Sequence, residues 1–216
     1  MNLIGLSVKQ IRISKGLTQS YISDYCQISQ SNYAKFEKGI IDIRASTFIS
    51  ILDSMDIPYH EFMYIHNKYN LSKKDAILYK FFNIPFNGIR ELNNLQMECR
   101  SYLSSYNSPI IKEAYTLSKA LLIIYKYNDF NEARQIAKPI WERLCKSNDL
   151  YLYDLYFLNA ILYIFSFEEA LNLKNFLFRG YEKYKNLNNT IPIFLNTHIN
   201  LSLLSIEHNR YNDALK

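Results

Sequence analysis

The 216-residue chain is 49% hydrophobic and 15% aromatic, which is enough to bury the core of one large or two small globular domains and excludes a disordered protein. Its formal charge of +5 permits binding to a polyanion but is modest for a protein that coats nucleic acid. With only 5 glycines and 5 prolines the sequence lacks the turn signals of many short strands, and leucine and isoleucine recur at helical spacing. We therefore predict an all-α fold.

The cysteines, histidines and apolar runs exclude several classes of protein. Cys26, Cys99 and Cys145 are far apart and form no CxxC pair, so we expect reduced thiols in a cytoplasm instead of disulfides or a zinc site. The sequence shows no metal-ligand spacing, glycine-rich phosphate loop or nucleophile elbow, so we expect no metal, no cofactor and no enzymatic activity. Its apolar runs, such as ALLIIY, are too short to cross a bilayer. The first residues show no long apolar run or small-residue cleavage site, so we expect no signal peptide.

Three short helices are predicted near the N-terminus. Ile4, Val8 and Ile11 recur at helical spacing, and a glycine at position 16 supplies the stop signal of the first helix. Thr18 and Ser29 are good N-caps for the second and third helices. Two short helices joined by a tight turn can place the N-terminus of the second one in the DNA major groove. This pattern predicts a DNA-binding unit.

The polar residues of this region are candidates for DNA contacts. Gln30, Ser31 and Asn32 fall in the first turn of the third helix, where amide and hydroxyl groups can hydrogen-bond to base edges. Lys35 lies one turn further on, and Gln19 begins the second helix, where its amide can approach the DNA backbone. Short polar residues at a helix start can also serve only as caps. The predicted DNA-contacting set is Arg12, Gln19, Gln30, Ser31, Asn32, Lys35 and Lys38.

Three motifs carry a family resemblance. LTQ at residues 17–19, ISQSN at residues 28–32 and FEKG at residues 36–39 resemble the lambda-repressor or XRE-type helix-turn-helix, over residues 3–65. In that family an arginine of the first helix pairs with the glutamate before the closing glycine. The resemblance therefore implies a structural ion pair between Arg12 and Glu37, with a phosphate contact by Arg12 as a further implication. Gln27 departs from the pattern, because the family often has a turn glycine there, and a left-handed glutamine costs about 1 kcal/mol.

The next segment narrows the resemblance. It predicts two further helices separated by a break at Pro58. ILDSMDIPYHEF followed by HNKY is similar to the end of the DNA-binding domain in Rgg/GadR/MutR-type regulators. We therefore expect the DNA-binding domain at residues 1–66. Its remaining inward-facing residues are predicted to be Tyr33, Phe36, Phe48, Ile51, Leu52, Met55, Phe62 and Ile65.

The rest of the chain predicts a helical-repeat domain. We expect a linker and the first repeat helices at residues 67–108, interrupted by a Pro-Phe-Asn-Gly turn, and tetratricopeptide-like repeats at residues 109–216. An aromatic-x-x-Ala motif begins at Phe130, at Phe167 and at Tyr211, and each copy opens an amphipathic helix. The sequence stops at Lys216 before a partner helix can cover the last one. We expect either a shortened paralogue or a fragment of a longer protein, or a last helix that packs on another subunit.

The resemblance implies a sequence-specific transcriptional regulator that binds double-stranded DNA as a homodimer, on an operator with an inverted repeat. It also implies control by a short signalling peptide bound in the repeat domain. The alternative is a shortened paralogue that acts as a dimerisation or protein-interaction partner without peptide sensing. Side-chain amides and guanidinium groups suit a peptide backbone and carboxylate, although a purely structural role is open for each. The candidate peptide-binding residues are Asn159, Asn196, Asn200, Arg134, Arg143 and Arg179.

Overall fold

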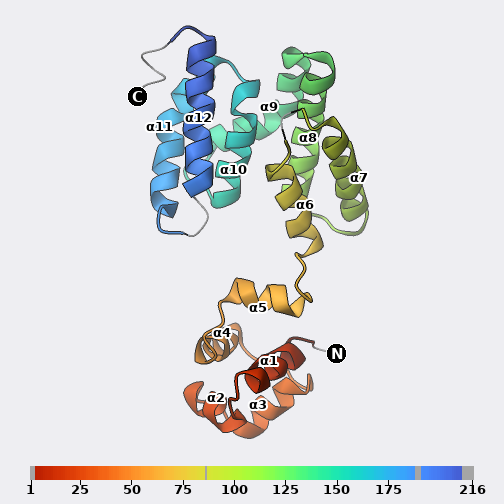
Figure 1. Ribbon diagram of the computed structural model, residues 1–216, viewed down its shortest axis with the longest axis vertical. Coiled ribbons are helices and arrows are strands. Elements are labelled where there is room, and N and C mark those ends of the chain that lie inside the picture. Colours follow the sequence, from red (N-terminus) through yellow and green to blue (C-terminus); the bar gives the residue numbers. More distant parts are fainter. Residues whose placement is uncertain (1–2, 86, 188–190, 211–216) are drawn as a thin grey trace. The chain divides into compact units, whose positions relative to one another are not determined.

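The computed structural model describes residues 3–85, 87–187 and 191–210, and these residues form helices and no strand. The predicted all-α fold is confirmed. The chain divides into two compact units, Met1–Ser72 and Lys73–Lys216, each with its own hydrophobic core (Figure 1). Residues 67–72 belong to the first unit, although we expected the linker to begin at residue 67.

The first unit consists of short helices whose ends follow the predicted caps. Thr18 Oγ1 accepts a hydrogen bond from the backbone N–H of Tyr21 at 3.1 Å, and Ser29 Oγ accepts one from the N–H of Asn32 at 3.2 Å. Each bond satisfies a backbone donor that has no partner within the helix. The helices are α1 (Leu3–Ser14), α2 (Gln19–Tyr25), α3 (Gln30–Glu37), α4 (Ala45–Ser54) and α5 (Tyr59–His66).

Most of the inward-facing residues that the sequence predicts form the core of the first unit, and Ile57 joins them. Full burial of one such apolar side chain contributes about 1.5–3 kcal/mol. Ile4, Phe48 and Ile65 are only half-buried and pack at the edge of this core. The buried core residues are Val8, Ile11, Ile22, Tyr33, Phe36, Ile51, Leu52, Met55, Ile57 and Phe62.

Each helix of the first unit ends in the same hydrogen-bonded turn, the Schellman motif. At the end of α2, the N–H of Ile28 donates to the carbonyl of Ser23 at 3.0 Å, and the N–H of Gln27 donates to the carbonyl of Asp24 at 3.2 Å. Gln27 has a φ of 53°, so it keeps the left-handed geometry that a turn glycine would adopt without strain. The left-handed residues of these turns are Gly16, Gln27, Gly39, Asp56, Lys68 and Tyr69.

A glycine allows α1 to lie directly against α3. A Cβ atom added to Gly5 would lie 1.9 Å from the carbonyl oxygen of Phe36, far inside van der Waals contact. Because no side chain separates the two backbones, the first turn of α1 lies directly against the C-terminal end of α3. This close approach brings Arg12 within reach of Glu37.

The second unit is an array of antiparallel helix pairs. Neighbouring helices in the chain pack on each other, as α6 does on α7, α8 on α9 and α10 on α11 (Figure 1). This arrangement agrees with the tetratricopeptide-like repeats that we predict. The elements are α6 (Lys73–Phe82), α7 (Ile89–Ser105), α8 (Pro109–Tyr127), α9 (Phe130–Lys146), α10 (Leu152–Ile161), the 3-10 helix η1 (Leu162–Ile164), α11 (Phe167–Tyr184) and α12 (Ile191–Glu207).

Two aromatic-x-x-Ala motifs open helices as expected. Phe130 begins α9 and Phe167 begins α11, and the alanines of both motifs are buried where another helix packs on them. The side chains of Asp129 and Ser166 cap these helices by accepting from backbone N–H groups. The third predicted copy, which begins at Tyr211, lies outside the described residues.

We expect Gly5→Ala to destabilise the first unit by about 1–3 kcal/mol, because the new methyl group must push α1 away from the Phe36 carbonyl. Chemical denaturation followed by circular dichroism measures the change. Gln10→Ala, on the exposed side of the same helix, is the control and should change stability by less than about 0.5 kcal/mol. Equal stability of both variants would contradict the close packing of α1 on α3.

Candidate nucleic-acid interface

The N-terminal turn of α3 presents polar side chains to solvent. Gln30, Ser31 and Asn32 are exposed, and the N-cap bond from the Asn32 N–H to Ser29 fixes the backbone beneath them. The opposite face of the helix is buried through Tyr33 and Phe36. Short amide and hydroxyl side chains on a rigid helix start can hydrogen-bond to base edges in a major groove. Lys35 and Lys38 are also exposed.

A buried ion pair anchors the other end of α3. Arg12 Nε donates to Glu37 Oε1 at 2.6 Å, and Arg12 Nη2 donates to Glu37 Oε2 at 3.0 Å. Arg12 Nη1 also donates to the carbonyl of Leu17 at 2.7 Å. Gln19 Nε2 completes the set with a 2.7 Å bond to Glu37 Oε2. These bonds join α1, the start of α2 and the end of α3 around one carboxylate, so they fix the angle between the two helices of the motif.

The charges of this network are stabilised by their partners. Burial alone raises the pKa of Glu37, but hydrogen bonds from Arg12 and then Gln19 outweigh it and hold the pKa below its ordinary value. The hydrogen bond to Glu37 outweighs burial and raises the pKa of Arg12. Burial, followed by the negative charge of Glu37, raises the pKa of Tyr33, whose phenol therefore stays protonated. At neutral pH the pair is fully ionised.

The expected ion pair between Arg12 and Glu37 is present, and Gln19 has a structural role beside it. The sequence suggested Gln19 as a contact to the DNA backbone, but its amide nitrogen is engaged by Glu37. Arg12 is only 8% exposed, and all three of its nitrogens donate to protein acceptors. Phosphate contacts by these two residues stay predictions. Sequence spacing gave no signal for the bond between Gln19 and Glu37, because the two residues lie in different helices.

The structure brings two of the candidate peptide-binding asparagines together. Asn200 Nδ2 donates to Asn159 Oδ1 at 3.2 Å, and Thr197 Oγ1 donates to the same oxygen at 2.9 Å. Since the Thr197 hydroxyl has one proton, Tyr181 must donate across their 2.6 Å contact when Thr197 donates to Asn159. This network joins α10, α11 and α12. Asn196, one turn from Asn200, is exposed.

The candidate arginines are in different surroundings. Arg143 is bonded to the carboxylates of Glu113 and Asp154, so it links α8, α9 and α10. Arg134 Nε donates to the carbonyl of Ile164 at 2.7 Å, while Arg179 is exposed and lines a cavity of about 160 Å³. Their contacts with a peptide stay predictions.

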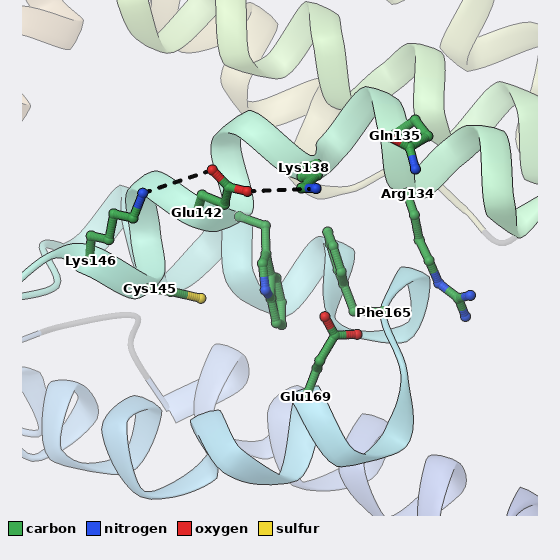
Figure 2. Close-up of a pocket in the computed structure, with 9 residues that line it drawn as sticks. Arg134, Gln135, Lys138, Glu142, Cys145, Lys146, Phe165 and Glu169 are labelled. Carbon is green, nitrogen blue, oxygen red and sulfur yellow. Dashed lines mark ion pairs between the residues drawn. The ribbon is translucent and has the colours of Figure 1, made fainter.

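Arg134 also lines a larger depression of about 370 Å³ between α9 and the start of α11. Figure 2 shows Lys138, Glu142 and Lys146 along α9, with Phe165 and Glu169 on the facing side. The carboxylate oxygens of Glu142 lie 3.9 Å from the Nζ atoms of Lys138 and Lys146. Both distances are long for an ion pair. The side chains that line this cavity carry both positive and negative charges, so the lining does not favour one class of ligand.

The described residues show neither metal site nor membrane helix. No group of three or more His, Cys, Asp or Glu among them could hold a metal ion, and none of their helices is long and apolar enough to cross a bilayer. The three cysteines are free thiols. Burial raises the pKa of Cys26 and Cys145, and it raises that of Cys99 to about 11, which disfavours the reactive thiolate at neutral pH.

The N-terminal domain matches a known family. Residues 8–62 match the model of the HTH_3 helix-turn-helix family. The match covers α2, α3 and α4 and parts of α1 and α5. No curated protein sequence matches the chain.

Solved structures share the fold of the whole chain. A protein assigned as a transcriptional regulator from Listeria monocytogenes EGD-e is 22% identical, with a TM-score of 0.81, over 98% of this chain and 72% of that one. The SHP pheromone receptor Rgg2 of Streptococcus dysgalactiae is 15% identical, with a TM-score of 0.67, over 98% and 73%. PlcR of Bacillus thuringiensis, solved with the peptide PapR7 and DNA, is 17% identical, with a TM-score of 0.61, over 100% and 76%. The predicted combination of helix-turn-helix and helical-repeat domains is confirmed.

We expect Glu37→Gln to destabilise the first unit by about 3–5 kcal/mol at neutral pH, because it leaves the buried Arg12 guanidinium without a counter-charge. Because the folded pKa of Glu37 lies below its ordinary value of 4.5, its contribution to wild-type stability is complete above that value. That contribution is lost as the pH falls through the folded pKa. Denaturation of the full chain at several pH values measures both effects.

The control for this experiment is Glu98→Gln, which removes one partner of the exposed Lys80–Glu98 ion pair. It should change stability by less than about 1 kcal/mol, because solvent screens an exposed pair. If the Glu37→Gln variant loses stability at acid pH as steeply as the wild type, the pH dependence does not arise from Glu37.

We expect Gln27→Gly to stabilise the first unit by about 0.5–1 kcal/mol, because glycine adopts the left-handed conformation of this turn without a Cβ clash. Thermal or chemical unfolding of the full chain measures the gain. Gln10→Gly, in the middle of α1, is the opposite control and should destabilise by about 1 kcal/mol. Destabilisation by both substitutions would contradict the positive φ of Gln27.

Proposed function

We propose that this chain is a sequence-specific DNA-binding transcriptional regulator of the Rgg type, which the HTH_3 match and the fold shared with Rgg2 support. The first unit reads the operator, and the second unit binds a short signalling peptide. The protein acts in the cytoplasm as a homodimer.

The observation that carries the DNA-binding proposal is the arrangement of α3. Its exposed first turn bears Gln30, Ser31 and Asn32, and its last turn is fixed from behind by the ion pair of Glu37 with Arg12. An Asn or Gln amide can donate to and accept from adenine at once, and a serine hydroxyl can do either. Lys35 and Lys38 supply exposed cations for phosphate groups.

A homodimer would place two copies of α3 on an inverted repeat. Successive half-sites read by such helices lie about one helical turn of DNA, roughly 34 Å, apart or at a multiple of that spacing. A ligand that favours one arrangement of the two DNA-binding units over another would then change operator affinity. The resemblance to Rgg-type regulators implies this control by a ligand, and the control gives the repeat domain its regulatory role.

The peptide proposal is supported by the asparagines of α10 and α12. Asn196 is exposed, and its neighbour Asn200 already contacts Asn159 through the hydrogen-bond network with Thr197. Side-chain amides of this kind can hydrogen-bond to a peptide backbone. A peptide would have to replace internal bonds of Asn159 or Asn200 but could reach Asn196 directly. Rgg2 is a pheromone receptor and PlcR was solved with a peptide, which supports the same role here.

Band-shift titration on the DNA that flanks the gene of this protein tests the proposal. Saturable binding that survives nonspecific competitor and strengthens as salt falls is the expected result. Weak binding that is indifferent to sequence, in a folded and dimeric sample, would overturn the proposal and favour a protein-interaction role. Addition of candidate peptides to the same assay then tests control of the complex.

We expect Asn32→Ala to weaken binding to the preferred operator by about 1–3 kcal/mol and to relax the choice of base at one position. Lys35→Ala should weaken binding evenly across sequences and reduce the salt slope by about 1, because it removes a phosphate contact. Asn94→Ala, an exposed change on α7 of the second unit, is the control and should leave binding unchanged. Unchanged base preference in the Asn32 variant would contradict the placement of α3 in the groove.

A further inference from the structure

Two cationic side chains of the second unit share one phenol. Arg100 Nε of α7 donates to Tyr115 Oη of α8 at 2.6 Å, and the guanidinium carbon of Arg100 lies 5.5 Å from the centre of the Tyr115 ring. Lys119 Nζ, one helical turn after Tyr115, lies 4.1 Å from the same centre. Arg100 is exposed and the other two side chains are half-buried, so the three groups reach solvent together. We call these three residues the Tyr115 cluster.

No carboxylate neutralises this cluster among the residues that the structure describes. Helices α7 and α8 carry three acidic residues, and two of them pair with other helices. Glu98 pairs with a lysine of α6, and Glu113 pairs with an arginine of α9. Glu91 precedes Arg100 by nine residues, which is about 13 Å along the helix. The two positive charges of the cluster therefore lack a counter-charge.

The free polar groups of the cluster are hydrogen-bond donors. Within the described residues Arg100 donates through Nε, which leaves its Nη groups for a ligand. A neutral phenol that accepts this bond keeps its own O–H to donate, and the Lys119 ammonium adds further N–H donors. A guanidinium, an ammonium and a hydroxyl together suit a phosphate group, whose oxygens accept hydrogen bonds and whose dianion matches two positive charges.

The phenol of Tyr115 already responds to this positive field. Burial raises the pKa of Tyr115, but hydrogen bonds from Arg100 and then Lys119 outweigh it and hold the pKa below the ordinary value of 10. A field that stabilises the negative oxygen of a phenolate attracts the oxygens of a bound anion for the same reason. Burial instead raises the pKa of Tyr33, Tyr153, Tyr163 and Tyr181.

We propose that the Tyr115 cluster is a binding site for one phosphate group, either free phosphate or the terminal group of a small phosphate ester. The Nη groups of Arg100 hold the phosphate from α7, and Lys119 and the Tyr115 hydroxyl hold it from α8. The bound phosphate therefore links two neighbouring helices. The site uses none of the residues that we propose for DNA or peptide contacts, so it stands or falls independently of those proposals.

The first test is isothermal titration calorimetry of the full chain with inorganic phosphate, in Tris chloride buffer at constant ionic strength. We expect saturable binding with a dissociation constant on the order of 1 mM. Arg100→Gln and Lys119→Gln should each raise this constant about tenfold, because each removes a charged donor. Tyr115→Phe should raise it about threefold, because it removes one neutral donor and keeps the ring. Circular dichroism should show that the variants keep the helix content of the wild type.

Lys126→Gln is the matched control. Lys126 is an exposed lysine of the same helix, seven residues or about 10 Å from Lys119, and its loss lowers the net charge by the same amount. Salt screens charges over this distance, so the control should change phosphate affinity by less than about twofold. An equal loss of affinity in Lys119→Gln and Lys126→Gln would overturn the site, because net charge alone would then attract phosphate.

The second test follows the phenol directly, by NMR of the full chain labelled with ¹³C at tyrosine Cζ. The spectrum of Tyr115→Phe identifies the Tyr115 signal by its absence. Phosphate should shift this signal saturably and raise the pKa of Tyr115, because a bound anion opposes formation of the phenolate. Sodium chloride at the same ionic strength should do neither. A Tyr115 signal that phosphate leaves unchanged would overturn the site, even if calorimetry detects binding elsewhere.

Titration with AMP separates the two sources of the phosphate group. Equal affinity for AMP and inorganic phosphate, with the same losses in the variants, supports a site for the phosphate group alone. Binding of AMP at least about tenfold tighter than phosphate supports a phosphate ester as the ligand. Failure of both compounds to bind, or binding that persists unchanged in Arg100→Gln, would overturn the proposal.

Discussion

The direction of α3 depends on the buried carboxylate of Glu37. Arg12 holds it from α1 and Gln19 from α2, so three helices meet at one charge. Gly5 is part of the same constraint, because α1 can reach α3 only where no side chain intervenes. Removing two charges from water is costly, and apolar packing could give comparable stability. A bidentate ion pair differs in being directional, and it holds one helix at one angle. The polar first turn of α3 would meet base edges in one orientation only when that angle is fixed.

The helices of the first unit were predictable from the sequence because their ends are determined locally. Thr18 and Ser29 cap the residues that directly follow them, and Gly16 and Gly39 occupy turns that favour glycine. The same local hydrogen bonds hold Gln27 in a left-handed conformation, so the predicted departure from the family pattern changes the strain of the turn and not its shape. The helical spacing of the apolar residues predicted most of the buried core, but not Ile57, which follows the end of α4.

The parts that the sequence did not predict depend on contacts between distant residues. Helical spacing could place Asn196 and Asn200 on one face, but it could not show that Asn159 of another helix would accept a bond from Asn200. The same holds for Arg143, which seemed suited to a peptide carboxylate and is bonded to two carboxylates of its own chain. Side-chain chemistry identifies what a residue can bind, and only the packing of the helices shows what it does bind.

The position of α12 connects the proposed peptide contacts to the core of the repeat domain. Asn200 is bonded to Asn159 of α10, and Thr197 of the same helix is bonded to Tyr181 of α11. An α-helix moves as a stiff element, so a peptide that displaces Asn200 from Asn159 would also disturb the core contacts of Ile193, Leu201 and Leu204. By thermodynamic linkage, a peptide that binds the dimer better than the monomer strengthens the dimer by the same factor. A peptide that engages these asparagines would therefore have to act through the packing of α12 on its neighbours.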